Sequence, residues 1–277
     1  MSFTRERECA VIARCLLILC LFIPWLRAAD EKKANKKPDP PKIITAVPFA
    51  AVAGETNTFF VRGLSLTNAT DIRFLLTSNL TAKIKSRGKA TLADKADPKK
   101  FGDTQLEVEV VLPADLPPGD LPFTIRTPDG EANTNLLRVV SRKTLRDEKE
   151  PNPGFRKANE ISIPQTVRGV VGEANDVDVF RFHGHARQSI VIETRSTLYG
   201  SSLDPLLTLY DASGHLLVTS DDARGLDARI ATILPEEGAY CISINDAHDR
   251  GGATYTYLIE ITVEAAHATA ATSQPYR

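Results

Sequence analysis

LLTLYDASGHLLVTS, residues 206–220, contains the pattern that decides the fold. Two runs rich in Leu, Thr and Val flank the tetrapeptide Asp211-Ala212-Ser213-Gly214. Asp and Ser form local turn hydrogen bonds, and Gly adopts a positive φ without steric cost. The stretch therefore predicts a β-hairpin with a tight turn.

Short strands of the same kind are expected throughout the second half of the chain. In the last of them, Tyr255, Tyr257, Ile259 and Ile261 alternate with mostly polar neighbours, so one face suits a core. The candidate strands are 165–171, 177–183, 189–194, 206–210, 215–220, 229–234, 239–245 and 254–263. Eight strands of this length predict a jelly-roll-like sandwich.

The first half also reads as strands. Residues 105–110, QLEVEV, alternate polar and apolar side chains with the period of a half-buried strand. Similar runs, separated by Gly and Pro, occupy residues 43–47, 56–62, 71–76, 82–86, 121–126 and 136–140. Residues 87–103 are more polar and are expected to form a long loop or insertion. Seven short strands without a convincing helix predict an immunoglobulin-like sandwich, so the fold class is all-β with two tandem β-sandwiches.

The N-terminus has the pattern of an export signal. Arginines precede the apolar run CLLILCLFIPWL, residues 15–26, which ends at Arg27-Ala28-Ala29. A run of this length is shorter than the ~20 residues that span a bilayer, so we expect a cleaved signal peptide and no membrane span afterwards. An uncleaved anchor, with the apolar segment counted from Ala10, and a lipoprotein site at Cys20 are the two alternatives.

Composition narrows the class of protein further. The chain has 34 Lys and Arg against 35 Asp and Glu, which argues against a nucleic-acid binder. Three of the four cysteines precede the predicted cleavage site, which leaves Cys241 alone and more typical of a packed thiol than of a nucleophile. Without a disulfide, each sandwich must be stabilised by its own core.

Shifts in composition divide the chain. The stretch EKKANKKPDPPK is an extended tether, and SRKTLRDEKEPNPG is charged and then punctuated by proline. We expect a signal peptide at 1–29, a Lys/Pro-rich linker at 30–42, the first sandwich at 43–140, a charged linker at 141–154, the second sandwich at 155–264 and a flexible tail at 265–277.

Both halves resemble known families. Residues 150–263 contain EPNPGFRKA, GVVGEANDVDVFRF, LDPLLTLYDASGHLLVTSDDARGLDARI and EEGAYCISINDAHDRGGATYTYLIEITV in order, and they resemble the bacterial pre-peptidase C-terminal (PPC) domain family. The resemblance implies a β-sandwich appendage, often attached to a secreted peptidase and usually not catalytic. Residues 41–74 and 112–140 resemble the immunoglobulin-like IPT/TIG modules of bacterial surface proteins.

Carboxylates cluster at two places near the start of the second sandwich. Glu148, Glu150 and Asn152 project to one side of an extended segment, and Asp176 and Asp178 share parity just before a strand. Two acidic segments could supply most of the six to eight oxygen ligands of calcium.

The calcium hypothesis depends mainly on Asp178. It also shares parity with Phe180 and Phe182, which are expected in the core, so its carboxylate needs either hydrogen-bond donors or a cation. The resemblance strengthens the calcium hypothesis, because related collagen-binding modules bind calcium near their N-terminal linker. Pro153 stands where the family often has an acidic or amide residue, directly after the Asn of this segment. The alternative is that the aspartates form turn and cap hydrogen bonds while Glu148 and Glu150 lie in a solvated linker.

Two further features have several interpretations. His183 and His185 would share a face in an extended strand and could bind zinc, but Gly184 is typical of a strand end and no third nitrogen or sulfur ligand lies nearby in sequence. Tyr199 is the best candidate for an exposed aromatic platform that binds sugars, although it could instead cover the rim of the sandwich.

The functional prediction is a non-catalytic one. The sequence contains no G-x-S-x-G, no H-E-x-x-H and no phosphate-binding glycine loop. We therefore expect that the protein is not an enzyme. We expect a secreted, periplasmic or cell-surface module that binds an extracellular polymer, a cell-wall component or an exported protein. The alternatives are an accessory or targeting subunit of a secreted peptidase and a weak carbohydrate-binding protein.

Overall fold

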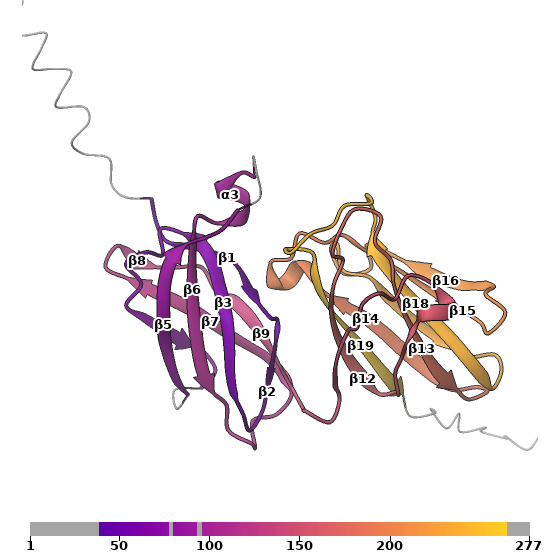
Figure 1. The fold of residues 1–277 in the computed structure, drawn as a ribbon. Coiled ribbons are helices and arrows are strands. Elements are labelled where there is room, and N and C mark those ends of the chain that lie inside the picture. Colours follow the sequence, from indigo (N-terminus) through magenta and orange to yellow (C-terminus); the bar gives the residue numbers. More distant parts are fainter. Residues whose placement is uncertain (1–38, 78–79, 93–95, 265–277) are drawn as a thin grey trace, which may run out of the picture. The chain divides into compact units, whose positions relative to one another are not determined.

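The computed structural model describes residues 39–77, 80–92 and 96–264 (Figure 1). The described residues from Pro40 onward belong to one compact unit. The predicted signal peptide at 1–29, most of the Lys/Pro-rich linker at 30–42 and the tail at 265–277 lie outside the described residues. Within the described part of the chain, no helix has the length and apolarity that crossing a membrane requires.

The first half is a sandwich of two sheets. Its strands are β1 (Lys42–Val47), β2 (Ala50–Val52), β3 (Thr56–Leu64), β4 (Asp71–Phe74), β5 (Thr81–Lys89), β6 (Thr104–Val111), β7 (Gly119–Thr127), β8 (Gly130–Glu131) and β9 (Asn135–Val140). One sheet has the order β1-β3-β6-β5 and the other β2-β9-β7-β4, with β8 paired to β7. A four-residue helix, α3 (Pro98–Phe101), lies in the segment that was expected to be a loop or insertion.

The predicted alternation of β6 explains the core of this sandwich. Leu106, Val108 and Val110 are fully buried, and the residues between them are partly exposed. They pack with Phe123 and Leu137 from the opposite sheet in one apolar cluster. Both sheets therefore bury one face against the other, as a sandwich requires.

The second half is a sandwich of two five-stranded sheets. Its elements are β10 (Leu145–Asp147), η1 (Phe155–Lys157), β11 (Asn159–Glu160), β12 (Gln165–Val170), β13 (Asp178–Gly184), β14 (Ser189–Arg195), η2 (Thr197–Tyr199), β15 (Pro205–Tyr210), β16 (Leu216–Ser220), β17 (Arg229–Ile233), β18 (Gly238–Asp246) and β19 (Thr256–Glu264), where η marks a 3-10 helix. The sheet orders are β10-β12-β19-β14-β17 and β11-β13-β18-β15-β16. The prediction of an all-β chain with two consecutive sandwiches is confirmed.

The hairpin that decided the fold is present between β15 and β16. Gly214 has φ of 83°, and the Asp211 Oδ1 accepts hydrogen bonds from the backbone N–H groups of Ser213 at 2.8 Å and His215 at 2.9 Å. Two strands beyond the predicted eight, β10 and β11, pair in parallel with β12 and β13. Strand β10 lies in the segment that was expected to be a charged linker. The segment is a strand instead, because its backbone pairs with β12 and extends a sheet of the second sandwich.

A third apolar cluster joins residues of both sandwiches. We call it the junction cluster; it contains Phe49, Ala50, Val52, Val140, Leu145, Tyr199 and Leu258. Tyr199 is fully buried there, with its ring stacked on that of Phe49 at 5.4 Å between centroids. Of the two interpretations of Tyr199, the exposed platform is therefore wrong and the covering of the sandwich rim is closer, because the first sandwich covers the loop that carries it.

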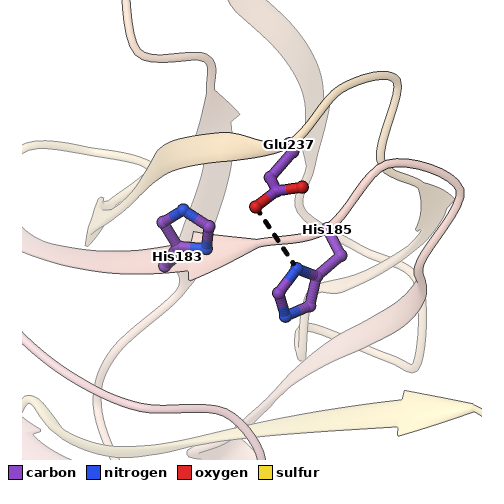
Figure 2. Close-up of side chains that lie close together, drawn as sticks. All are labelled: His183, His185 and Glu237. Carbon is purple, nitrogen blue, oxygen red and sulfur yellow. Dashed lines mark ion pairs between the residues drawn. The ribbon is translucent and has the colours of Figure 1, made fainter.

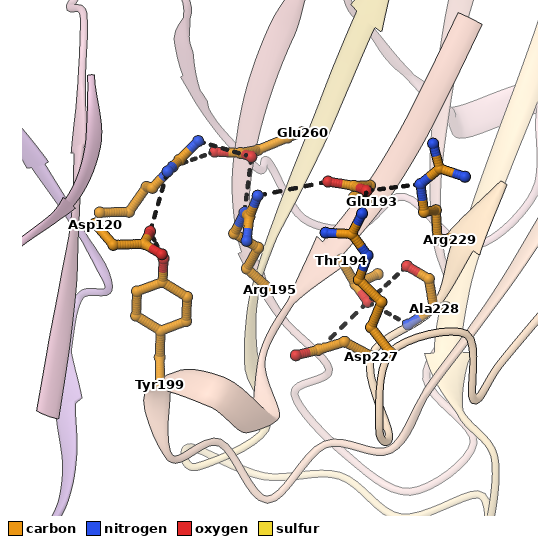
Figure 3. Close-up of polar contacts among 11 residues, drawn as sticks. Asp120, Glu193, Thr194, Arg195, Tyr199, Asp227, Ala228, Arg229 and Glu260 are labelled. Carbon is orange, nitrogen blue, oxygen red and sulfur yellow. Dashed lines mark hydrogen bonds and ion pairs between the residues drawn. The ribbon is translucent and has the colours of Figure 1, made fainter. Parts of the chain in front are cut away.

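Polar contacts border the junction cluster (Figure 3). The Tyr199 hydroxyl donates to Asp120 at 2.6 Å, and Arg138 donates to Asp120 at 3.0 Å and to Glu260 at 3.0 Å. Arg195 donates to the same Glu260 carboxylate at 2.8 Å. The side chains of Arg138, Arg195 and Glu260 are less than one-fifth exposed, so water screens this network only partly.

Candidate cation site

The segment that enters the second sandwich places three acidic side chains together. Glu148, Glu150 and Asp178 each offer a carboxylate oxygen, and these oxygens lie within 4.8 Å of one another. Asp178 is fully buried, Glu148 is half-buried and Glu150 is exposed. The structure thus brings together three of the four carboxylates among the predicted metal ligands.

The backbone explains how Glu148 reaches this position. The N–H of Glu148 donates to the carbonyl of Arg168 at 2.9 Å, which continues the pairing of β10 with β12. Its Oε2 accepts a hydrogen bond from the N–H of Val170 at 2.9 Å. The side chain is therefore fixed over β12, and Gly169 lies directly beneath it.

Asn152 closes the same site. Its side-chain Nδ2 donates to Glu148 Oε1 at 3.2 Å, and its backbone N–H donates to Glu150 Oε2 at 2.9 Å. Its carbonyl accepts from the N–H of Val179 at 3.2 Å, which ties the entering segment to β13. Because Nδ2 is turned toward Glu148, the amide oxygen Oδ1 is left for another partner.

Two buried oxygens at this site have no hydrogen-bond partner. Among the described residues, three buried side-chain oxygens have no hydrogen-bond partner. Two of these three are Asn152 Oδ1 and Asp178 Oδ1. A buried oxygen without a partner costs roughly 1–3 kcal/mol, so each such atom in a native protein calls for an explanation. Both atoms are acceptors beside acidic groups, which is the arrangement that a hard cation would satisfy.

The electrostatics of Asp178 agree with that interpretation. Burial, together with the hydrogen bond and the negative charge of Glu148, raises the pKa of Asp178 to about 10. The Tyr257 hydroxyl is 2.8 Å from Asp178 Oδ2 and 3.1 Å from Glu148 Oε1, and its single proton can serve only one of them at a time. The Tyr257 hydroxyl therefore cannot serve both carboxylates at once, and Asp178 Oδ1 has no donor at all.

Asp176 is placed differently. Its Oδ2 accepts a hydrogen bond from the N–H of Gly172 at 2.7 Å, so it organises the loop between β12 and β13, as the alternative interpretation expected. It also lines an open surface pocket together with Glu150 and Pro153. Asp176 therefore lies outside the close group of Glu148, Glu150 and Asp178.

The residues fit a calcium ion. Glu148, Glu150, Asn152 and Asp178 would hold it through oxygen atoms alone. Calcium prefers such ligands and accepts irregular geometry. A bound ion would supply positive charge where three carboxylates and an unpartnered amide oxygen meet.

Gly169 is required by this arrangement. A Cβ at this position would lie 2.3 Å from the Tyr257 hydroxyl oxygen and 2.7 Å from Glu148 Oε2. We expect Gly169→Ala to lower the free energy of unfolding by roughly 2–4 kcal/mol, because buried polar groups must move. Urea unfolding measures this. Gly172→Ala is the matched control, since its Cβ would meet Asp176 Oδ2 at an ordinary 3.5 Å. Equal stability of the two variants would contradict the expectation.

A second acidic side chain, Asp246, shows what a satisfied buried carboxylate looks like in this protein. Its Oδ1 accepts from the N–H groups of His248 at 3.0 Å and Arg250 at 3.1 Å, and the guanidinium of Arg250 donates to both oxygens. Although burial opposes it, these donors hold the pKa of Asp246 below its ordinary value. Asp246 therefore organises its loop through protein donors, in contrast to Asp178.

Comparison of the sequence with known proteins finds similarity over part of the chain. No family model matches the chain. A probable subtilase-type serine protease of Deinococcus radiodurans is 36% identical over 105 residues, which cover 37% of this chain. This chain covers only 14% of the length of that curated relative.

Two solved structures illustrate the structural likenesses. The pre-peptidase C-terminal domain of a Bacillus anthracis collagenase is 17% identical, with a TM-score of 0.33, covering 42% of this chain and all of that one. The Bacteroides ovatus protein SGBP-B, in complex with a mixed-linkage heptasaccharide, is 12% identical with a TM-score of 0.27, and the match covers 83% of this chain and 78% of that one. By its own structure the chain is an all-β protein of two consecutive sandwiches, with an acidic, oxygen-lined site where the second begins.

Proposed function

We propose that this protein is a calcium-stabilised, non-catalytic module of the cell envelope or the extracellular space, which binds a polymer, a cell-wall component or another exported protein. The observation that carries the calcium part is the pair of unpartnered buried oxygens, Asn152 Oδ1 and Asp178 Oδ1, beside Glu148 and Glu150. The predicted export signal favours the compartment.

The calcium part is tested by thermal unfolding of the chain in calcium and in chelator. A hundredfold excess of calcium over its dissociation constant should stabilise the protein by about 2.7 kcal/mol, because the ion binds only the folded state. We expect Glu150→Gln to remove this rise. Glu131→Gln is the matched control, since Glu131 is an exposed carboxylate of the first sandwich that pairs with Arg73. A melting temperature that does not respond to calcium or chelator would refute the proposal.

A role beside an exported peptidase is the second candidate. It is favoured by the similarity to the Deinococcus protein, a probable subtilase-type serine protease. The chain covers only 14% of the length of that protein. The purified chain should not hydrolyse casein with or without calcium. Turnover that survives chelation and disappears on changing one side chain would show an enzyme instead.

The carbohydrate alternative has less support from the side chains. Sugar-binding platforms use exposed aromatic rings, and Tyr199 is buried in the junction cluster. Among the described residues, the exposed large aromatic side chains are Phe60 and Phe155, one on each sandwich.

A further inference from the structure

Two histidines and a glutamate converge at the far end of β13 from the cation site (Figure 2). His183 lies near the end of that strand, His185 is the first residue after it, and Glu237 directly precedes β18. One ligand atom from each of the three lies within 4.8 Å of the others. Glu237 is the third ligand that sequence spacing did not reveal, because it follows His185 by about fifty residues and approaches through strand pairing.

The side chains are close but remain open to solvent. His185 Nδ1 is 3.9 Å from Glu237 Oε1, and the centroids of the two imidazole rings are 5.5 Å apart. The side chains of His185 and Glu237 are 68% and 66% exposed. An ion could therefore enter without any opening of the fold.

The backbone that carries His185 is held by Gln188. The Gln188 side-chain oxygen accepts from the N–H of His185 at 3.0 Å, and the N–H of Gln188 donates to the His185 carbonyl at 3.1 Å. Two backbone hydrogen bonds join the same turn to Leu234. The N–H of Arg187 donates to the Leu234 carbonyl at 2.8 Å, and the N–H of Leu234 donates to the Gln188 carbonyl at 2.9 Å.

The turn that carries Glu237 is held by Tyr240. The Tyr240 hydroxyl donates to the carbonyl of Glu236 at 2.7 Å and accepts from its N–H at 3.2 Å. The two turns also pack tightly, since a Cβ at Gly184 would lie 2.2 Å from Leu234 Cδ1. Because the backbone beside each ligand is fixed, binding would require ordering of side chains rather than of loops.

The donor set selects a class of metal. Two imidazole nitrogens and one carboxylate oxygen suit zinc and neighbouring late first-row transition metals, whereas calcium prefers oxygen ligands alone. Asp178 and His183 are five residues apart on β13, about 16 Å at the rise of a strand, so this site is separate from the cation site.

We propose that His183, His185 and Glu237 form a surface site for a late first-row transition metal ion of the zinc class. The three side chains supply three ligands, and the remaining coordination positions are open to water. Such a site is distinct from the calcium site in both position and donor chemistry.

Calorimetric titration of the chain with Zn²⁺, in saturating Ca²⁺ and without a polyhistidine tag, tests the proposal. We expect one zinc site, and His183→Ala or His185→Ala should weaken binding about tenfold or more. Glu237→Gln should weaken it as well, since a neutral amide is a poorer ligand. Titration with Co²⁺ should give the visible absorption bands of a nitrogen- and oxygen-ligated ion, and these should vanish in the His183→Ala/His185→Ala double variant.

His215→Ala is the matched control. His215 is exposed, lies in the β15–β16 turn beside Asp211 and is not one of the three clustered residues, so its replacement should leave zinc affinity unchanged. Asp178→Asn should also leave it unchanged, which separates this site from the calcium site. The replaced histidines are exposed, so unchanged circular dichroism should confirm folding. Absence of zinc binding by the wild type, or equal binding by the double variant, would overturn the proposal.

Discussion

In the absence of calcium, Asp178→Asn should stabilise the protein, by about 2 kcal/mol at neutral pH. Burial and the neighbouring Glu148 raise the pKa of Asp178 from 3.8 to about 10, so this side chain must keep a proton that it would release in the unfolded chain. Asn removes that cost and provides an N–H donor beside Glu148. Most buried polar residues behave in the opposite way, because their replacement leaves partners unsatisfied.

The sign of the pH dependence follows from the same pKa. A carboxyl group with a raised pKa in the folded state contributes a loss of stability that begins above its unfolded pKa and grows until its folded pKa is reached. Between about pH 5 and pH 9, the calcium-free wild type should therefore lose stability relative to Asp178→Asn. Urea unfolding in chelator at several pH values measures the difference. Lower stability of the variant throughout that range would contradict the electrostatic account.

Tyr199→Ala should cost about 3–5 kcal/mol of stability, the range for a large aromatic side chain removed from a packed core. Tyr199 is fully buried in the junction cluster and stacks on Phe49. Tyr199→Phe keeps the ring and loses only the hydrogen bond to Asp120, so it should cost about 1 kcal/mol. Chemical unfolding of both variants measures the difference.

A matched comparison is available in the same sandwich. Tyr210 is half-buried and contacts Phe155 edge-on, so Tyr210→Ala should cost less than Tyr199→Ala. If Tyr199→Ala lowered stability by no more than Tyr210→Ala, the contact between the two sandwiches would not stabilise the protein as described.

Local patterns in the sequence were enough to predict the two sandwiches. Alternation in residues 105–110 and the turn at Asp211–Gly214 are each encoded within a few residues, and both occur as predicted. Parity also placed Asp178 at a buried edge with Phe180 and Phe182. Such signals depend only on the geometry of an extended strand.

Contacts between distant segments could not be predicted in the same way. Leu258 lies on the face of β19 opposite Tyr257, among mostly polar neighbours, and it is buried because the junction cluster covers it. Tyr199 is buried for the same reason. Glu237 reaches His185 only through the pairing of β13 with β18, which a single sequence does not specify.

The candidate cation site could be predicted from the sequence only in part. Its acidic residues were predicted from spacing, and the resemblance to PPC domains pointed to calcium. The unpartnered oxygens of Asn152 and Asp178 could be found only in the structure, because they depend on where Tyr257 and Val170 direct their donors.

Calorimetric titration of the metal-free chain with calcium tests the central claim most directly. The account predicts saturable binding at one site of this oxygen cluster in the wild type and its loss in both Asp178→Asn and Glu148→Gln, with Glu131→Gln unchanged. Absence of a binding heat at millimolar calcium, or binding that persists in Asp178→Asn and Glu148→Gln, would contradict it.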